Sequence, residues 1–406
     1  MTDIQKENKS GGKVPNNPKQ IPNLRFPEFE GEWEVKKLGE IATFSKGKGI
    51  SKSEIEENGI TECIRYGELY THYREVINEI KSRTNVDKSA LVLSEENDVI
   101  IPASGETTID IATASCVLKP GIALGGDLNI IKSKNDGVFL SYYLNSKKKM
   151  EIANLAQGIS VVHLYSSQLA SLSLSLPTNQ EQEKISTFLA KISERIDCSI
   201  KIINDLKTLK TATAKKIFSQ ELRFKDDNGN DFPEWEVREV GEVFKITRGN
   251  VLAMNLVSNQ CNEKNTYPVY SSQTKNNGLA GYYTDFLFED AITWTTDGAN
   301  AGDVNYRSGK FYCTNVCGVL ISNEGYANSC IAELINSVSK NYVSYVGNPK
   351  LMNGVMSEIK IPFPSLPEQT KIANFLSAID SKIDMENQLL QKLEEQKKYL
   401  LQNMFV

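Results

Sequence analysis

Residues that commonly perform catalysis occur in this chain without the neighbours that catalysis requires. The two histidines, His72 and His163, have no partner at the spacing of a metal site or of a base-activated nucleophile. The segments Glu79-Ile80-Lys81 and Glu358-Ile359-Lys360 match the Glu-x-Lys fragment of metal-dependent nucleases, but so short a fragment recurs by chance. These residues therefore do not indicate a nuclease centre.

Motifs for nucleotide binding and methyl transfer are also missing from the sequence. The pair Gly309-Lys310 comes nearest to a phosphate-binding loop, but Phe311 follows it and the required upstream glycine is absent. The glycine-rich stretch 45–49 is too short to cradle a nucleotide. No Asn/Asp-Pro-Pro-aromatic tetrapeptide, with which adenine N6-methyltransferases hold the target amino group, is present. The sequence thus predicts a chain without a catalytic site.

The seven cysteines do not predict a metal site. Their number is odd, none forms a Cys-x-x-Cys pair, and two histidines supply few nitrogen ligands for zinc. We interpret the cysteines as reduced thiols in the core of a cytoplasmic protein.

Composition and charge restrict the class of protein further. The 406 residues predict two or three domains, and no apolar run reaches the roughly 18 to 20 residues that span a bilayer. The polar segment 1–20 lacks the apolar core of a secretory signal, and we expect it to be a disordered tail. A formal net charge of −5 argues against holding nucleic acid by bulk electrostatics alone, but it does not exclude a locally basic face.

The sequence contains an internal repeat of the segments that would position any functional residue. Residues 181–218 align without a gap with residues 368–405, at an offset of 187, with 12 of 38 positions identical. A strand-like stretch that ends in proline precedes each segment. The beginnings of the two halves also match, because Trp33-Glu34-Val35 corresponds to Trp235-Glu236-Val237, and a Phe-Pro-Glu lies upstream in both, at Phe26 and Phe232. This repeat predicts an alternation of globular region and helix.

The two repeated segments have the apolar periodicity of long helices. Apolar residues recur every three or four positions, and neither segment contains glycine or proline. A helix of this length measures about 57 Å, so its apolar stripe needs a partner, and the other copy is the obvious one. The alternative is that each helix packs on its own domain. The residues expected to pack are Ile185, Phe188, Leu189, Ile192 and Ile196 in the first segment, and Ile372, Phe375, Leu376, Ile379 and Ile383 in the second.

We therefore predict a mixed α/β fold with a pseudo-two-fold internal repeat. Two domains of short strands and loops, 21–177 and 222–366, are separated by two long antiparallel coiled-coil-like helices, 178–221 and 367–406. The runs Val99-Ile100-Ile101 and Ala291-Ile292-Thr293-Trp294 are expected to be buried strands. Glycine-bearing turns follow them, at Ser104-Gly105 and Asp297-Gly298.

The order of these motifs resembles one known family. The segments 177–185 and 364–372 both have the pattern Pro-x-x-x-Glu-Gln-x-x-Ile, which closely resembles the conserved regions of type I restriction-modification specificity subunits. The opening Trp-Glu-x-x-x-x-Gly-Glu of each half resembles the start of their target-recognition domains, and so do the stretches 267–272 and 295–302. The resemblance extends from residue 21 to the C-terminus.

This resemblance implies a protein that reads double-stranded DNA. Each target-recognition domain would read one half of a bipartite target in the major groove, and the helices would set the spacer between the halves. The helices would also dock two modification (methyltransferase) subunits, which carry S-adenosylmethionine and methylate adenine N6. Restriction subunits would add ATP-driven translocation and cleavage. The chain itself is expected to bind no cofactor and no metal.

Candidate DNA-binding residues are polar and aromatic side chains on loops, since base edges are read by bidentate hydrogen bonds. Lys46, Lys48 and Arg248 lie beside glycine at one repeat position and suit contact with phosphate. The first domain offers Arg65, Tyr66, Glu68, Tyr70, Thr71, Tyr73, Ser104 and Glu106. The second offers Tyr270, Ser271, Ser272, Gln273, Thr274, Lys275, Asn276, Thr295, Thr296 and Asp297.

Two other functions stay open on the sequence alone. The first is a nuclease or methyltransferase with its own recognition domains, which the missing catalytic motifs oppose. The second is a scaffold that does not bind DNA and uses its paired helices to assemble partners.

Overall fold

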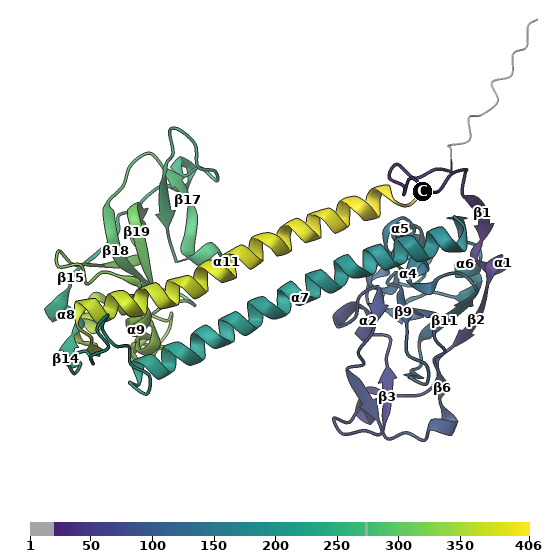
Figure 1. The fold of residues 1–406 in the computed structure, drawn as a ribbon, viewed down its shortest axis with the longest axis horizontal. Helices are drawn as coiled ribbons and strands as arrows, with labels where there is room; N and C mark the ends of the chain where they lie inside the picture. Colours follow the sequence, from purple (N-terminus) through teal and green to yellow (C-terminus); the bar gives the residue numbers. More distant parts are fainter. Residues whose placement is uncertain (1–19, 273–274) are drawn as a thin grey trace, which may run out of the picture. The chain divides into compact units, whose positions relative to one another are not determined.

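The computed structural model describes residues 20–272 and 275–406 (Figure 1). The chain divides into two compact units: unit 1 contains the residues up to Ser199 together with Leu389–Val406, and unit 2 contains Ile200–Gln388. The predicted tail, 1–20, lies almost entirely outside the described residues.

Unit 1 is built on two sheets with short helices around them. The five-stranded sheet has the order β2-β11-β7-β9-β4, and its central strand β7 (Asp98–Pro102) is buried throughout, as the apolar run predicted. The other strands of this sheet are β2 (Ala42–Lys46), β11 (Leu128–Ser133), β9 (Ser115–Val117) and β4 (Val76–Ile77). The four-stranded sheet consists of β5 (Ser82–Thr84), β3 (Thr61–Ile64), β10 (Ala123–Leu124) and β6 (Val92–Leu93).

Two strand pairs and several short helices complete unit 1. Strand β1 pairs antiparallel with β13, the strand that leads into the first long helix, and β8 pairs antiparallel with β12. These strands are β1 (Glu34–Lys37), β13 (Ser173–Leu176), β8 (Ser104–Gly105) and β12 (Val162–His163). The helices are α1 (Leu38–Ile41), α2 (Glu68–Thr71), α3 (Thr108–Ile111), α4 (Gly137–Ser146), α5 (Lys149–Leu155) and α6 (Ser166–Ala170), with 3-10 turns at Lys52–Glu54 and Lys88–Ala90.

Unit 2 contains a six-stranded sheet of order β15-β20-β18-β19-β16-β17, with the pair β14-β21 beside it. The pair β14-β21 repeats the pair β1-β13 of unit 1, since a first strand again pairs with the strand before a long helix. The strands are β14 (Glu236–Glu239), β15 (Lys245–Arg248), β16 (Tyr267–Tyr270), β17 (Leu279–Tyr283), β18 (Phe288–Thr295), β19 (Val304–Cys313), β20 (Cys317–Ile321) and β21 (Lys360–Phe363). The helices are α8 (Val240–Val243), α9 (Ser329–Ser339) and α10 (Asn353–Glu358), with 3-10 turns at Met254–Leu256, Lys275–Gly278 and Lys340–Tyr342.

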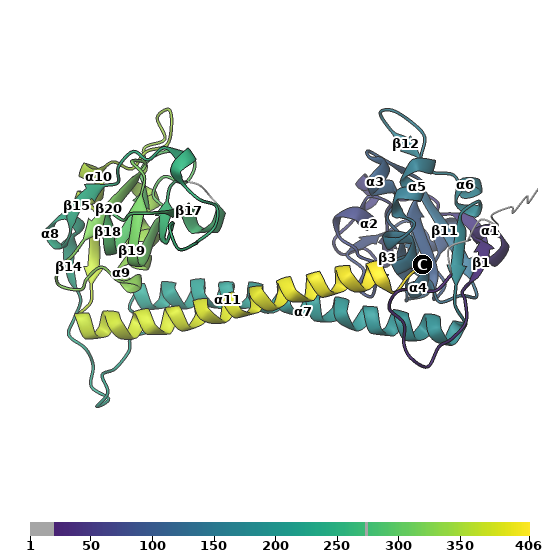
Figure 2. The same cartoon turned by 90° about the horizontal axis from the view of Figure 1, so that it is seen from above.

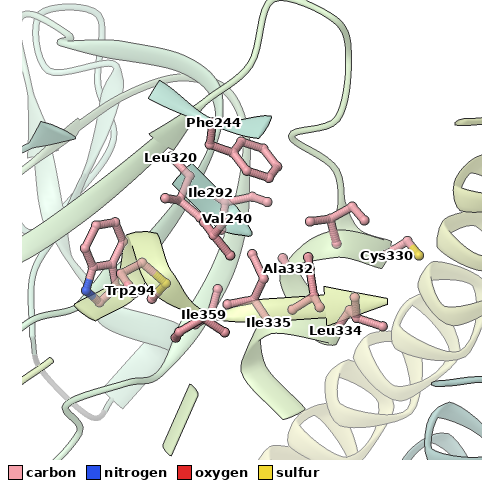
Figure 3. Packing of buried hydrophobic residues seen from close by; sticks show 14 of the residues in the cluster. Val240, Phe244, Ile292, Trp294, Leu320, Cys330, Ala332, Leu334, Ile335 and Ile359 are labelled. Atoms are coloured by element: carbon pink, nitrogen blue, oxygen red, sulfur yellow. The ribbon is translucent and has the colours of Figure 1, made fainter. Parts of the chain in front are cut away.

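The core of unit 2 lies between its sheet and helix α9. Trp294 of β18 is buried there with Ile292 and Leu320 from the sheet and Ile335 from α9 (Figure 3). The Trp294 indole donates to the carbonyl of Leu351 at 3.0 Å, which satisfies its one polar atom in the core. The predicted buried strand at 291–294 is confirmed.

The two long helices are α7 (Asn179–Phe218) and α11 (Leu366–Asn403). Each unit holds the beginning of one helix and the end of the other, so the helices run in opposite directions, as predicted. Within unit 2, Ile217 of α7 and Ile372 and Leu376 of α11 belong to one buried cluster that also contains the sheet domain's side chains. The apolar stripe therefore packs both on the other helix and on the helix's own domain, which combines the two alternatives of the sequence.

The remaining residues of the predicted stripe are either buried or lie at its edge. The side chains of Ile185, Leu189, Ile192 and Ile196 are buried in α7, and those of Ile379 and Ile383 are buried in α11. Phe188 and Phe375 instead lie at the edge of the stripe. Phe188 packs against Phe26, with ring centroids 5.7 Å apart, and Phe375 packs against Phe224, at 5.6 Å. In unit 2 the two contacts of Phe26 are divided: Phe224 packs on the helix, whereas Phe232 lies beside the lysine, since Lys184 is 4.8 Å from the Phe26 ring centroid and Lys371 is 5.9 Å from that of Phe232.

A buried glutamate at the start of α7 holds the N-terminal segment of unit 1. Glu181, 1% exposed, accepts hydrogen bonds from Nε and Nη2 of Arg25 at 2.8 and 2.7 Å and from the Trp33 indole at 3.4 Å. The side-chain bond to Glu181 raises the pKa of the Arg25 guanidinium. We call this arrangement of arginine, tryptophan and glutamate a clamp.

Unit 2 repeats the clamp at the start of α11. Glu368, 0% exposed, accepts from Nε and Nη2 of Arg223 at 3.3 and 3.0 Å and from the Trp235 indole at 2.8 Å. The glutamine after each glutamate donates to the carbonyl of the proline that follows the preceding strand. The Gln182 carbonyl oxygen also accepts from the backbone N–H of Asp136 at 3.1 Å, and that of Gln369 accepts from Nδ2 of Asn328 at 2.8 Å. Since Asp136 and Asn328 are the N-caps of α4 and α9, the Glu-Gln motif ties each long helix to its domain.

Five of the seven cysteines are buried and all seven are free thiols, whereas Cys198 and Cys261 are exposed and so do not fill a core. Within the described ranges, no helix has the length and apolar character needed to cross a membrane.

Candidate nucleic-acid interface

One exposed cation stands beside a glycine at the end of a sheet strand in each unit. Lys46 is the last residue of β2 and Arg248 is the last residue of β15, and both side chains are exposed. The next residues, Gly47 and Gly249, admit no side chain, because an added Cβ would lie 2.0 Å from a backbone carbonyl oxygen at Gly47 and 2.1 Å from one at Gly249. The close backbone packing therefore holds both cations at the same structural position. Lys48, also exposed, follows in unit 1.

In unit 1, the turn that carries Arg65 is built around the buried carboxylate of Glu68. This carboxylate accepts from the backbone N–H of Arg65 at 2.9 Å and from the Ser82 hydroxyl, and it lies 3.6 Å from Nη2 of Arg65. The Arg65 side chain is half-buried, and its Nε has no hydrogen-bond partner. Glu68 is thus engaged inside the unit and orients Arg65.

The aromatic candidates of unit 1 lie on either side of this turn. Tyr66 and Tyr73 pack against the apolar core, and the Tyr73 hydroxyl accepts from the backbone N–H of Lys81 at 2.9 Å. Burial raises the pKa of Tyr73 to about 12. Burial also raises the pKa of Tyr70, and the side chains of Tyr66 and Glu106 add to this shift.

Three further candidates of unit 1 differ in what they present to solvent. Thr71 is exposed, and its hydroxyl donates to the carbonyl of Gly67 at 2.8 Å. Ser104 is buried in β8, where it pairs with His163 of β12. In contrast, Glu106 two residues later is exposed.

The corresponding turn of unit 2 is Thr295-Thr296-Asp297. Thr295 and Thr296 are buried, and the Thr296 hydroxyl bonds with the Asp297 carboxylate at 2.8 Å. The backbone of Asp297 forms an isolated antiparallel β-bridge with that of Lys350, as Ser104 pairs with His163 in unit 1. The two glycine-bearing turns therefore occupy equivalent places.

The loop after β16 contains the largest group of candidates in unit 2. The N–H of Ser271 donates to the carbonyl of Gly278 at 2.8 Å, and this bond closes the loop. Asn276 and its neighbour Asn277 adopt left-handed backbone angles, with φ of 52° and 51°. The predicted residues Gln273 and Thr274 lie outside the described residues, as does the side chain of Lys275. Ser272 is half-buried and its carbonyl accepts from Asn300 at 3.4 Å.

A buried arginine that the sequence analysis missed, Arg307, holds the 271–278 loop in place. Arg307 of β19 is 8% exposed; its Nη2 donates to the carbonyl of Asn277 at 2.7 Å, and its Nε donates to the Thr293 hydroxyl at 3.1 Å. Its guanidinium lies over the Tyr270 ring, 3.8 Å from the centroid. Burial lowers the pKa of Arg307. The sequence signal that could have identified Arg307 was its charge, because it lies within a segment with the pattern of a strand.

Ser271, Thr295 and Arg307 line a polar cavity of about 280 Å³ together with Asn300 and Asn305. The structure thus brings together candidates from two separate stretches of sequence. Among the residues described, no group of three His, Cys, Asp or Glu could hold a metal ion. The arrangement offers hydrogen-bond donors and acceptors on constrained turns, which is the chemistry of recognition.

Comparison with known proteins gives a consistent result. The model of the family described as type I restriction modification DNA specificity domain matches residues 30–208 and 233–395. The chain is similar to the MpnII specificity subunit of a type I restriction enzyme of Mycoplasma pneumoniae, with 36% identity over 36% of this chain and 44% of that protein. It is also similar to the MjaVIII specificity subunit of Methanocaldococcus jannaschii, with 24% identity over 94% of this chain and 93% of that one.

A solved structure shares the fold. The specificity subunit of the type I restriction-modification system from M. genitalium superposes with a TM-score of 0.70 at 18% identity, over 95% of this chain and 99% of that one.

Proposed function

The chain belongs to the family of type I restriction-modification DNA specificity subunits, and on this premise we propose that each of its two sheet-rich domains reads one half of a bipartite DNA target. Such a chain is the non-catalytic specificity component of a type I restriction-modification complex. The observation that carries the bipartite proposal is structural repetition. Each unit has the same clamp, the same glycine-flanked cation and an equivalent turn, whereas the loops around them differ.

We assign the domain boundaries as the sequence suggested them: recognition domains at 21–177 and 222–366, with α7 and α11 forming the conserved helical regions. In this assignment, Lys46, Lys48 and Arg248 contact phosphates. The accessible polar residues of the turns, among them Thr71 and Glu106 of unit 1 and Asn276 of unit 2, contact bases. We assign these roles because the side chains are exposed and because they lie at strand ends and turns of the proposed recognition domains.

The buried candidates take a different part in the same proposal. Glu68, Ser104, Thr295 and Thr296 are enclosed by their own domains, so they would position the reading turns and not touch DNA. Arg307 would do the same for the 271–278 loop, because it bonds to the carbonyl of Asn277.

The proposed partners follow from the family. Two modification subunits would dock on the helices and methylate adenine N6 with S-adenosylmethionine, and restriction subunits would supply ATP-driven translocation and cleavage. The helices would set the spacer between half-sites. The place of action would be the cytoplasm, where a bacterial or archaeal chromosome is accessible.

Domain exchange tests the bipartite proposal. A chain in which residues 222–366 are replaced by the second domain of another family member is expressed with the partner subunits in a host without other methylases. Methylome sequencing should show a target in which one half is new and the other half and the spacer are unchanged. A change in both halves would contradict independent reading by the two domains.

A further inference from the structure

Each unit carries one hairpin loop of the same construction. In unit 1, Gln157 and His163 exchange two backbone hydrogen bonds of 2.9 and 2.7 Å, and in unit 2, Ser344 and Lys350 exchange two of 2.9 Å. The closing residues of the two hairpins are separated by the offset of 187 that relates the long helices. The hairpin is therefore part of the duplicated architecture and not an irregular loop of one unit.

The tips of both hairpins are apolar and exposed. Ile159 is 100% exposed and Val346 is 92% exposed, and these two residues occupy the same repeat position. Val161 and Tyr345 beside them are also exposed, and the loops 158–162 and 345–349 contain no charged residue. A single exposed aliphatic side chain is ordinary. A fully exposed β-branched side chain at the same place in both units, within an uncharged loop, instead indicates a contact surface.

Each hairpin pairs with the glycine-bearing turn of its unit, at Ser104-Gly105 in unit 1 and at Asp297-Gly298 in unit 2. The N–H of Leu164 donates to the carbonyl of Ala103 at 3.0 Å, and β12 pairs with β8. In unit 2, the N–H of Leu351 donates to the carbonyl of Thr296 at 2.9 Å, in the same place. Figure 2 shows the loop around β12 projecting from the body of unit 1.

The base of each hairpin is fixed by a side chain of its domain. In unit 1, the side-chain amide of Asn129 donates to the carbonyl of Leu164 at 2.9 Å. In unit 2, the indole of Trp294 donates to the carbonyl of Leu351 at 3.0 Å. Each tip is thus presented on a rigid base next to the polar turn of its unit.

We propose that the two hairpin tips enter a groove of the DNA, one in each half-site, and contact the bases through the aliphatic side chains of Ile159 and Val346. This inference rests on the proposed function and deepens it. An aliphatic side chain gains nothing from phosphates, whereas thymine methyl groups, base edges and sugar faces inside a groove bury aliphatic surface. Lys46, whose ammonium lies 6.0 Å from the ring centroid of Tyr165 just after the first hairpin, and its counterpart Arg248 would hold the DNA backbone.

Binding of the complete complex to cognate duplex tests the proposal. The complex of this chain with its modification subunits is prepared as wild type, Ile159→Ser and Val346→Ser, and the dissociation constant is measured over a range of salt concentrations. Loss of a buried aliphatic contact should weaken cognate binding by about ten- to a hundredfold. The slope of affinity against salt should not change, because no phosphate contact is lost.

Matched controls separate this effect from a general loss of exposed apolar surface. Val35→Ser on β1 and Val237→Ser on β14 remove side chains that are also exposed but belong to strands outside the hairpins and the long helices, and these variants should bind as wild type does. Ile159→Val should keep most of the affinity. Because the tip residues have no intramolecular packing to lose, the thermal stability of Ile159→Ser should equal that of wild type.

Three results would overturn the proposal: equal affinity of the serine variants and wild type, a changed salt slope, or a loss of co-purifying modification subunits in place of DNA affinity. The last result would assign the tips to a protein partner. If the wild-type complex itself showed no preference for any bipartite sequence, the proposed function would fail, and this outcome is distinct from the other three.

Discussion

Removing the arginine of one clamp should destabilise unit 2 far more than removing an exposed ion pair. In Arg223→Met, the carboxylate of Glu368 keeps one neutral donor, the Trp235 indole at 2.8 Å, and loses both guanidinium bonds. Because Glu368 is 0% exposed, water cannot replace the lost donors. Leaving a buried charge without its partner costs about 3 to 5 kcal/mol.

The matched control is Lys360→Met. It removes the ion pair of Lys360 with Glu239, whose atoms are 3.6 Å apart and whose side chains are both exposed. Such a pair contributes about 0 to 1 kcal/mol. Urea denaturation followed by tryptophan fluorescence measures both variants, since Trp235 lies within the clamp and reports on its opening.

One further variant checks the physical cause. The double variant Arg223→Met with Glu368→Gln should recover much of the lost stability, because a neutral amide can still accept from Trp235 and carries no charge to desolvate. A loss in Arg223→Met below about 1 kcal/mol, as small as that of the control, would refute the argument from burial.

Two other predictions concern DNA. Lys46→Ala or Arg248→Ala should weaken binding of the complex to all sequences alike and flatten its dependence on salt, by roughly one counterion for each phosphate contact; an unchanged salt slope would remove the phosphate assignment. Four residues inserted after Ser199 in α7 and four after Gln388 in α11, where the two units divide, add about 6 Å and slightly more than a full turn to each helix. The recognised spacer should therefore grow by one or two base pairs. Methylome sequencing measures the spacer, and an unchanged spacer would contradict the proposal that the helices set the distance between the half-sites.

The place of the insertion depends on the structure. Lys210, near the end of α7, bonds with Glu333 at 2.6 Å and with Asp380 at 2.9 Å, and Ile217 is in the core of unit 2. An insertion near Thr211 would therefore disrupt packing inside unit 2. Apolar periodicity did not reveal this, because a helix that packs on its own domain and one that packs on another helix show the same spacing.

Clamp residues show what a motif can and cannot tell. The Glu-Gln dipeptide was visible in the sequence, because it stands at the same distance before the apolar stripe in both halves. Its arginine partners were not found, since Arg25 and Arg223 are more than a hundred residues away from Glu181 and Glu368. The repeated Leu-Arg-Phe at 24–26 and 222–224 was the available signal.

The sequence by itself determined the repeat, the long helices, the buried strands at 99–101 and 291–294, and the absence of catalytic motifs. These features are local or periodic, so the order of residue types is enough to specify them. Tertiary structure alone decided which candidates are accessible. Glu68 and Thr296 are polar residues on turns, as Glu106 and Asn276 are, yet the first two are enclosed by the strands packed around them. Burial depends on residues distant in the chain, and neither residue type nor spacing records that.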